Sequence, residues 1–207
     1  MLLVIGNKNY SSWSLRPWLA MKVLGIAFDE KRIPLYRDGA KAEILRYSPA
    51  GKVPILQDGT TVVWDSLAIL EYLAERYPLW PKDAAERAKA RSIAAEMHSG
   101  FAKLREHMSM NIRKRYPGKG RTPEVMQEIE RIQEIWGAAR GPFLFGSFGA
   151  ADAMYAPVAL RFRTYEVELA PSARRYADAL LALPAMGEWV AAAEREAEAI
   201  PALDIYE

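Results

Sequence analysis

Hydrophobic and polar positions divide the start of the chain into short alternating elements. Residues 2–5 form an uninterrupted apolar run closed by Gly-Asn, which predicts a fully buried strand. Between Ser14 and Gly25 the apolar residues recur at helical spacing, with Ser14 as the expected N-cap. A weak alternation over residues 28–34 predicts a second strand, which a helical crossover would place parallel to the first.

The pattern changes after a short predicted helix at residues 40–47. Residues 53–57 predict a strand that Pro54 opens, and Asp58-Gly59 is a hairpin signal before an antiparallel partner strand at residues 61–64. A further helix starts at Leu67 and ends near residue 77. The predicted order over residues 1–77 is therefore β-α-β-α-β-β-α, an α/β domain.

Residues 78–83 contain two prolines and no periodicity, and we expect them to be a linker. Everything after them has helical character, so residues 84–207 predict an all-α domain. Its first helix is expected to run from Ala84 to about Ile112, and Thr122-Pro123 is a helix start. Later helices are expected to begin near residues 150, 172 and 185.

Composition narrows the possible functions. The net charge of +2 in 207 residues is too small for a protein that binds a nucleic-acid backbone. The absence of cysteine excludes disulfides and a catalytic thiol of the protein's own. Residues 1–5 are too short an apolar run for a signal peptide or a membrane span, so we expect a cytoplasmic protein. His98 and His107 lack the spacing and acidic neighbours of a metal site, and none is expected.

A polar loop carries the first candidate site. Ser11 and Ser12, with Tyr10 and Trp13 beside them, lie between the first predicted strand and the first predicted helix. Free N–H groups at a helix N-terminus favour an anion, and a thiolate stabilised by one hydroxyl donor is such an anion. The alternative is that Ser12 or Ser14 only caps the helix.

Two more segments have the chemistry to bind a peptide. A cis bond between Val53 and Pro54, next to Lys52, would turn the Val53 backbone outward to pair with an extended ligand. Asp65 accepts from an ammonium group, and Ser66 donates to a carboxylate, so the pair matches the α-amino acid end of a ligand. A helix cap is the alternative interpretation of Asp65-Ser66.

These segments resemble a known family when they are read together. Tyr-Ser-Ser-Trp-Ser-Leu-Arg, Ser-Pro-Ala-Gly-Lys-Val-Pro-Ile-Leu and Asp-Ser-Leu-Ala-Ile-Leu-Glu-Tyr-Leu are similar to the N-terminal domain of the glutathione transferase superfamily. Residues 143–146 and 149–152 extend the resemblance into the second half. It implies a thioredoxin-like domain followed by a helical domain, usually as a homodimer. Glutathione would bind the first domain, with an apolar acceptor site between the two.

The resemblance also implies roles for residues. The catalytic hydroxyl falls on Ser11 or Ser12, with Tyr10 as a less favoured third donor. Glutathione contacts fall on a set that surrounds one tripeptide: Ser11, Trp13, Lys52, Val53, the cis-proline Pro54, Asp65 and Ser66. The acceptor pocket is expected to include Tyr10, Phe101, Arg105 and Met108.

The implied function is a glutathione transferase whose serine stabilises the glutathione thiolate for attack on a small electrophile. The motifs are most similar to serine-type classes, including the zeta class known for maleylacetoacetate isomerase activity. Trp13 and Trp18 stand where zeta-type sequences have a cysteine and a second arginine, so isomerase activity is not assigned. The alternatives are a non-catalytic binding module of the same fold and a glutathione-dependent isomerase or peroxidase.

Overall fold

A four-stranded mixed sheet forms the first part of the computed structural model, which describes residues 1–206. The strands are β1 (Leu2–Ile5), β2 (Asp29–Arg32), β3 (Ile55–Asp58) and β4 (Thr61–Trp64). Their order in the sheet is β2-β1-β3-β4; β1 is parallel to β2, while β1 and β3 and likewise β3 and β4 are antiparallel. The predicted α/β order is confirmed.

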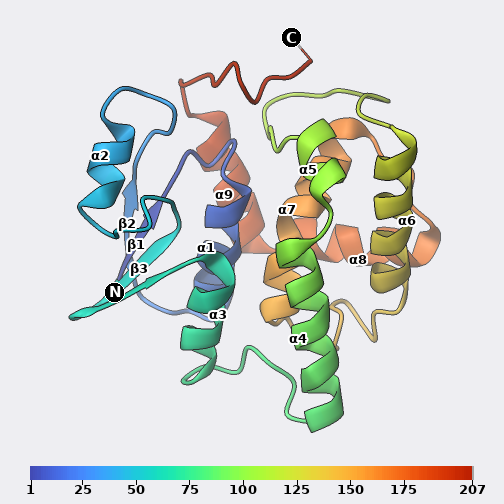
Figure 1. Ribbon diagram of the computed structural model, residues 1–207. Coiled ribbons are helices and arrows are strands. Elements are labelled where there is room, and N and C mark those ends of the chain that lie inside the picture. The colour runs from blue at the N-terminus through green and yellow to red at the C-terminus, as the bar shows by residue number, and fades with distance from the viewer. Residues whose placement is uncertain (207) are drawn as a thin grey trace.

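Helices cover both faces of this sheet. They are α1 (Ser12–Val23), α2 (Ala40–Leu45) and α3 (Ser66–Ala74). Leu3 and Ile5 pack in the main core with α1 and α3, whereas Val4 packs in a smaller cluster with Ile44 of α2. Figure 1 shows α2 on one side of the sheet and α1 and α3 on the other. Because both sides of β1 are buried, the strand is apolar at every position.

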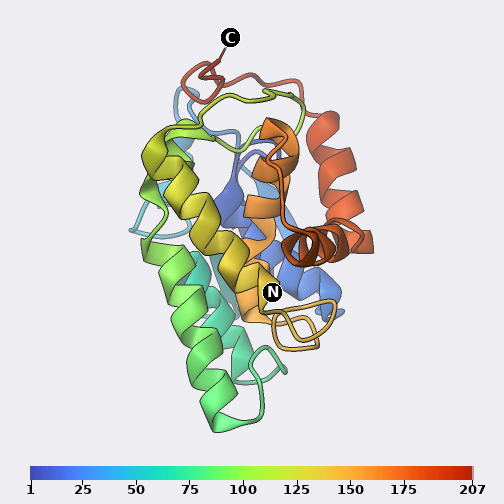
Figure 2. The same ribbon diagram turned by 90° about the vertical axis from the view of Figure 1, so that its right-hand side faces the viewer.

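The rest of the described chain is helical. The helices are α4 (Ala84–Ser99), α5 (Ala102–His107), α6 (Pro123–Gly137), α7 (Ala150–Tyr165), α8 (Pro171–Leu181) and α9 (Pro184–Glu194). Every residue of α7 except Arg163 is buried, and α7 packs against α1, α4 and α8 (Figure 2). The α/β domain followed by a helical part confirms the predicted glutathione transferase fold class. The linker predicted at residues 78–83 lies between α3 and α4.

The single long helix expected from Ala84 to Ile112 is wrong, because the chain breaks between α4 and α5. A Cβ atom on Gly100 would lie 2.8 Å from the Glu96 carbonyl oxygen, so the close approach there requires glycine. Phe101 then adopts a left-handed conformation with φ 54°. The break turns α5 toward the β1–α1 loop and brings Arg105 to the site described below.

Asp152 organises the start of α7 without the hydroxyl partner that a serine or threonine at Gly149 would supply. Its carboxylate accepts from the backbone N–H groups of Leu144 and Gly149 and from the Tyr176 hydroxyl, at 3.0, 2.9 and 2.9 Å. A Cβ atom on Gly149 would lie 2.8 Å from the Leu79 carbonyl oxygen, which explains the glycine. Within residues 1–206, no helix combines the length and apolar character needed to span a membrane.

Candidate functional site

The β1–α1 loop places two serine hydroxyls at the start of α1. Ser11 is the N-cap and Ser12 the first helical residue, so α1 begins before the predicted Ser14 cap. The Ser14 hydroxyl is used differently: it accepts from the Gly6 N–H at 3.1 Å. The loop is closed by hydrogen bonds from the Tyr10 and Ser11 N–H groups to the Asn7 carbonyl, at 3.2 and 2.8 Å.

The two hydroxyls face different partners. Ser11 Oγ donates to Ser14 Oγ at 2.7 Å and accepts a longer bond of 3.4 Å from the Ser14 N–H. Ser12 Oγ accepts from the Arg161 guanidinium at 3.2 Å. Ser11 therefore belongs to the network of the first domain, and Ser12 to a contact with the helical part.

A cavity of about 770 Å³ opens beside these hydroxyls. Residues of the first domain on its wall include Ser11, Ser12, Trp13, Lys41 and Val53. Residues of the helical part on its wall include Arg105, Ser109, Met110, Arg161 and Leu203. The cavity thus lies between the two parts of the chain, where the acceptor site was expected.

A second cavity of about 500 Å³ shares Trp13, Lys52 and Val53 with the first. Its remaining wall contains Ala50, Pro54, Trp64, Asp65 and Ser66. The Val53–Pro54 peptide bond is cis. The ladder between β1 and β3 reaches only Ile55, so the Val53 backbone lies outside it. The serine loop, the Val-Pro segment and the Asp-Ser segment thus line two cavities that share part of their walls.

Asp65 is the N-cap of α3, and it also lines the second cavity. One carboxylate oxygen accepts from the N–H groups of Leu67 and Ala68, at 2.8 and 3.3 Å. The other lies 2.7 Å from His98 Nε2 of α4. Partial burial favours the neutral acid, but the hydrogen bond and charge of His98 outweigh it, so the pKa of Asp65 lies below its usual value. Asp65 is therefore an anion at neutral pH.

Three guanidinium groups approach the site from α1, α5 and α7. Burial, with the charges of Arg161 and Arg105 nearby, lowers the pKa of Arg16 to about 9. Burial also lowers the pKa of Arg161 to about 10. Arg16 and Arg161 donate to carbonyl and hydroxyl oxygens rather than to carboxylates. Within residues 1–206, no carboxylate accepts a hydrogen bond from either group, although the Asp65 charge acts on Arg16, so the region carries buried positive charge that favours an anionic ligand.

Trp13 lines both cavities and lies near three basic side chains. The Arg16 guanidinium lies 4.1 Å from its ring centroid and that of Arg105 5.7 Å. The His98 ring meets Trp13 edge-on, with centroids 5.4 Å apart. Trp18, in contrast, is buried against Trp189 and donates to Glu30, away from both cavities.

The remaining acceptor-pocket candidates divide into two groups. Tyr10 and Arg105 line the first cavity, whereas Phe101 and Met108 are packed in the core and do not line it. The Tyr10 hydroxyl donates to Asp204 at 3.1 Å and accepts from the Ile200 N–H at 3.2 Å, so it holds the C-terminal segment. No group of three or more potential metal ligands occurs among residues 1–206.

Sequence reasoning missed Arg161, Lys41 and Leu203. Arg161 could have been found, because it is a charged residue within an alanine-rich apolar stretch and lies one helical turn beyond Pro157. Lys41 had no signal, since it is one of many lysines. Leu203 comes from a segment without periodicity, and only the folded chain brings it to the cavity.

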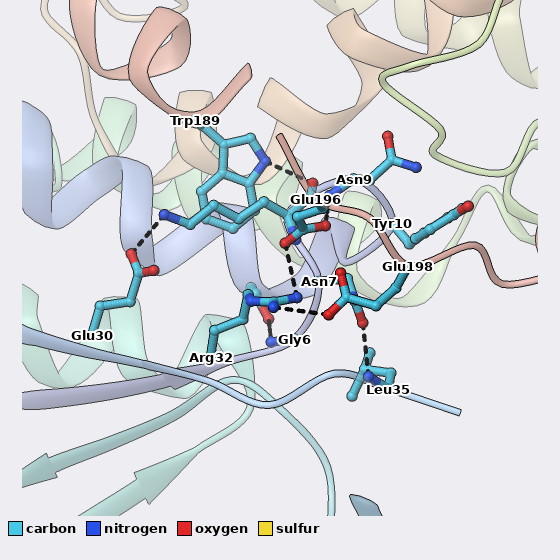
Figure 3. A network of polar contacts seen from close by, with 12 residues as sticks. Gly6, Asn7, Asn9, Tyr10, Glu30, Arg32, Leu35, Trp189, Glu196 and Glu198 are labelled. Carbon is cyan, nitrogen blue, oxygen red and sulfur yellow. Dashed lines mark hydrogen bonds and ion pairs between the residues drawn. The ribbon is translucent and has the colours of Figure 1, made fainter. Parts of the chain in front are cut away.

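The loop that carries the serines is also held from outside the first domain. The Glu196 carboxylate accepts from the backbone N–H groups of Lys8 and Asn9, at 2.7 and 3.0 Å. Figure 3 shows Glu196 against this loop, with the Arg32 guanidinium between the carboxylates of Glu196 and Glu198. The Trp189 indole donates to the Lys8 carbonyl at 2.9 Å. The residues after α9 thus contribute directly to the loop conformation.

Comparisons with known proteins identify chains of similar sequence and fold. The family model for the glutathione S-transferase N-terminal domain matches residues 10–76. The chain is 30% identical over 204 residues to a maleylacetoacetate isomerase of Pseudomonas aeruginosa, covering 89% of this chain and 93% of that protein. It is 37% identical over 100 residues to a probable maleylacetoacetate isomerase of Caenorhabditis elegans, covering 47% and 46%. The alignments thus span about half the length of the first curated relatives.

A solved structure has the same fold. The crystal structure of a maleylacetoacetate isomerase from Methylobacterium extorquens AM1, with bound malonate and glutathione, matches with a TM-score of 0.71 and 22% identity. The match covers 97% of this chain and 100% of that one. At this identity the likeness concerns the fold.

Proposed function

Because the chain belongs to the glutathione transferase superfamily, as the resemblance predicted, we propose that it binds glutathione and activates its thiol for attack on a small electrophile. The observation that carries the proposal is the junction of the two cavities. There, Ser11 and Ser12 line the first cavity, Asp65 lines the second, and Val53 lines both. One tripeptide with an ammonium end, a central peptide unit and a thiol meets all of these groups.

In this proposal each end of glutathione has a matching partner. Asp65 and Ser66 hold the γ-glutamyl ammonium and carboxylate, and the Val53 backbone beside Pro54 pairs with the cysteinyl unit. Lys52, which lines both cavities, and Lys41 offer cations to the glycyl carboxylate. The sulfur then lies at the N-terminus of α1, against Ser11.

Three groups favour the thiolate in this position. The Ser11 hydroxyl donates a hydrogen bond to sulfur, with Ser12 as the alternative donor. The dipole of α1 favours a negative charge at its N-terminus by about 0.3 to 1 kcal/mol. The buried charges of Arg16 and Arg161 act in the same direction. The thiol proton leaves to solvent, and the thiolate forms a carbon–sulfur bond with the electrophile. A leaving group such as chloride then departs with its electron pair, or, where the electrophile is an activated double bond, the displaced electron pair takes a proton from solvent.

A carboxylate-bearing electrophile is the substrate class that we propose. Arg161 and Arg105 line the first cavity and have no carboxylate partner at hydrogen-bond distance on that wall. This arrangement supports glutathione-dependent cis–trans isomerisation as a second candidate function. The thiolate would add to a double bond, the new single bond would rotate, and the thiolate would leave again. Relatives named maleylacetoacetate isomerase and a neighbour with bound malonate support this candidate.

Further parts of the proposal rest on the family resemblance. We propose two domains, residues 1–77 and 84–207, in a cytoplasmic homodimer that detoxifies or isomerises electrophiles. Size-exclusion chromatography with light scattering measures the oligomeric state.

The test combines binding with turnover. Calorimetry with glutathione, followed by assays with a chlorinated nitroaromatic electrophile and with a cis-configured unsaturated diacid, separates the candidates. Conjugation of the aromatic supports the transferase, and conversion of the diacid without net consumption of glutathione supports the isomerase. Binding without turnover of either compound would favour a non-catalytic module, and absence of glutathione binding would refute the proposal.

A further inference from the structure

The C-terminal segment, residues 195–206, runs over the end of the molecule where the β1–α1 loop and the loop after α5 lie (Figures 1 and 2). It contributes Leu203 to the wall of the first cavity. The Leu203 carbonyl accepts from the Ser109 hydroxyl at 2.7 Å, and the Tyr206 hydroxyl donates to the His107 carbonyl at 2.8 Å. The segment is therefore attached along its length to the α5–α6 region.

Glu196 links this segment to the β1–α1 loop through two hydrogen bonds to its carboxylate. Its side chain is only 6% exposed, and its two oxygens accept from two consecutive backbone N–H groups, those of Lys8 and Asn9. Hydrogen bonds to a carboxylate are stronger than neutral ones, and two at neighbouring peptides fix the orientation of both peptide planes. These peptides lie directly before Tyr10 and Ser11.

A second anchor involves Tyr10 and Asp204. One Asp204 oxygen accepts from the Tyr10 hydroxyl at 3.1 Å, and the other from the Asn111 amide at 2.6 Å. Asn111 in turn accepts from the Asn9 amide at 3.0 Å. The two anchors therefore hold the loop at residues 8–9 and at residue 10, the three residues directly before Ser11.

We infer that Glu196, supported by Asp204, is a positioning residue for Ser11: the C-terminal segment sets the position of the hydroxyl that faces the glutathione sulfur. This inference rests on the proposed function. Glu196 lines neither cavity that would hold glutathione, so it acts through the loop. Because a displacement of about 1 Å costs on the order of 100-fold in rate, even a modest loop shift is measurable.

The test is Glu196→Gln, with Glu198→Gln as the matched control. A glutamine offers one acceptor oxygen and sets an NH₂ group against the second N–H donor, so the loop moves. Glu198 lies on the same segment and pairs with the same arginine at 2.8 Å, but it makes no bond to the loop through its side chain. We expect Glu196→Gln to lower kcat about 10-fold with glutathione affinity within about 2-fold. The pH midpoint of thiolate formation in bound glutathione should rise, while the control keeps all three values.

A purely structural role predicts something different. It would lower the thermal midpoint and the active fraction while leaving the thiolate midpoint of the folded protein unchanged, and that result would overturn the inference. Asp204→Asn, which weakens the second anchor, is the alternative variant if Glu196→Gln does not fold, and it must move the thiolate midpoint in the same direction. If wild-type protein fails to bind glutathione, the proposed function fails first. A wild-type protein with a lowered thiol midpoint that Glu196→Gln does not change refutes this inference alone.

Discussion

Replacing Ser11 with alanine tests the proposed chemistry most directly. In the structure the Ser11 hydroxyl donates to Ser14 Oγ at 2.7 Å, so it must give up this bond to donate to a thiolate. A neutral hydrogen bond contributes about 1 kcal/mol net, and one to a charged partner about 1.5 to 3 kcal/mol. The difference is about 0.5 to 2 kcal/mol. Because about 1.4 kcal/mol corresponds to one pKa unit, Ser11→Ala should raise the pKa of bound glutathione thiol by about one unit.

The assay is the ultraviolet absorbance of the thiolate in the protein–glutathione complex, titrated against pH. Ser12→Ala is the comparison variant, because the Ser12 hydroxyl lines the same cavity, accepts from Arg161 at 3.2 Å and is the alternative donor to sulfur. The loss of the Ser11 cap should cost little stability, near the lower end of about 0.5 to 2 kcal/mol, since its bond to the Ser14 N–H is long at 3.4 Å. A raised midpoint in Ser12→Ala with an unchanged midpoint in Ser11→Ala would refute the choice of Ser11.

Three further predictions concern charged residues around the site and the core. Asp65→Asn should weaken glutathione binding about 10-fold by calorimetry, but leave binding of an analogue without the α-amino group within about 2-fold. Arg161→Met should lower kcat/KM for a carboxylate-bearing electrophile about 10- to 100-fold more than for a neutral one, whose smaller loss reflects the weaker stabilisation of the thiolate; equal losses for both would contradict the assigned contact with the substrate carboxylate. Burial raises the pKa of Asp152 to about 6, above its unfolded value. Its contribution to stability is therefore full below about pH 4, and about 3 kcal/mol is lost as pH rises through 6. Asp152→Asn should flatten this fall in urea unfolding measured from pH 4 to 7.

The order of strands and helices in the first domain was predictable because short sequence motifs determine it. The apolar run of β1, the Asp58-Gly59 hairpin and the proline at the start of β3 each act within a few residues, so the α/β order followed from them. The break at Gly100 did not, because a close approach to the Glu96 carbonyl is visible only in the folded helix. Alanine-rich periodicity alone continues through that glycine.

The site was predictable where one short segment carries the chemistry. Ser11, Val53 and Asp65 each lie in a recognisable motif, and the structure brings them to one pair of cavities. Arg161, Leu203 and Glu196 come from remote segments, and their roles depend on tertiary contacts that no local pattern encodes. Phe101 and Met108 are expected in the acceptor pocket only if one helix continues beyond Ala84 to Ile112. The chain instead breaks between α4 and α5, and both residues lie in the core.

The ring of Trp13 lies against the buried guanidinium of Arg16 and affects how that charge is held. A buried arginine usually needs a partner, and a carboxylate next to Arg16 would satisfy it but would cancel its field at the sulfur. An aromatic face 4.1 Å away stabilises the guanidinium through its quadrupole and leaves the positive charge intact. Burial lowers the pKa of Arg16 to about 9, while the Asp65 charge raises it, so the guanidinium between the Trp13 ring and the Met154 carbonyl stays charged at neutral pH. Under the proposed function, the positive charge that this pairing keeps on α1 favours ionisation of the glutathione thiol.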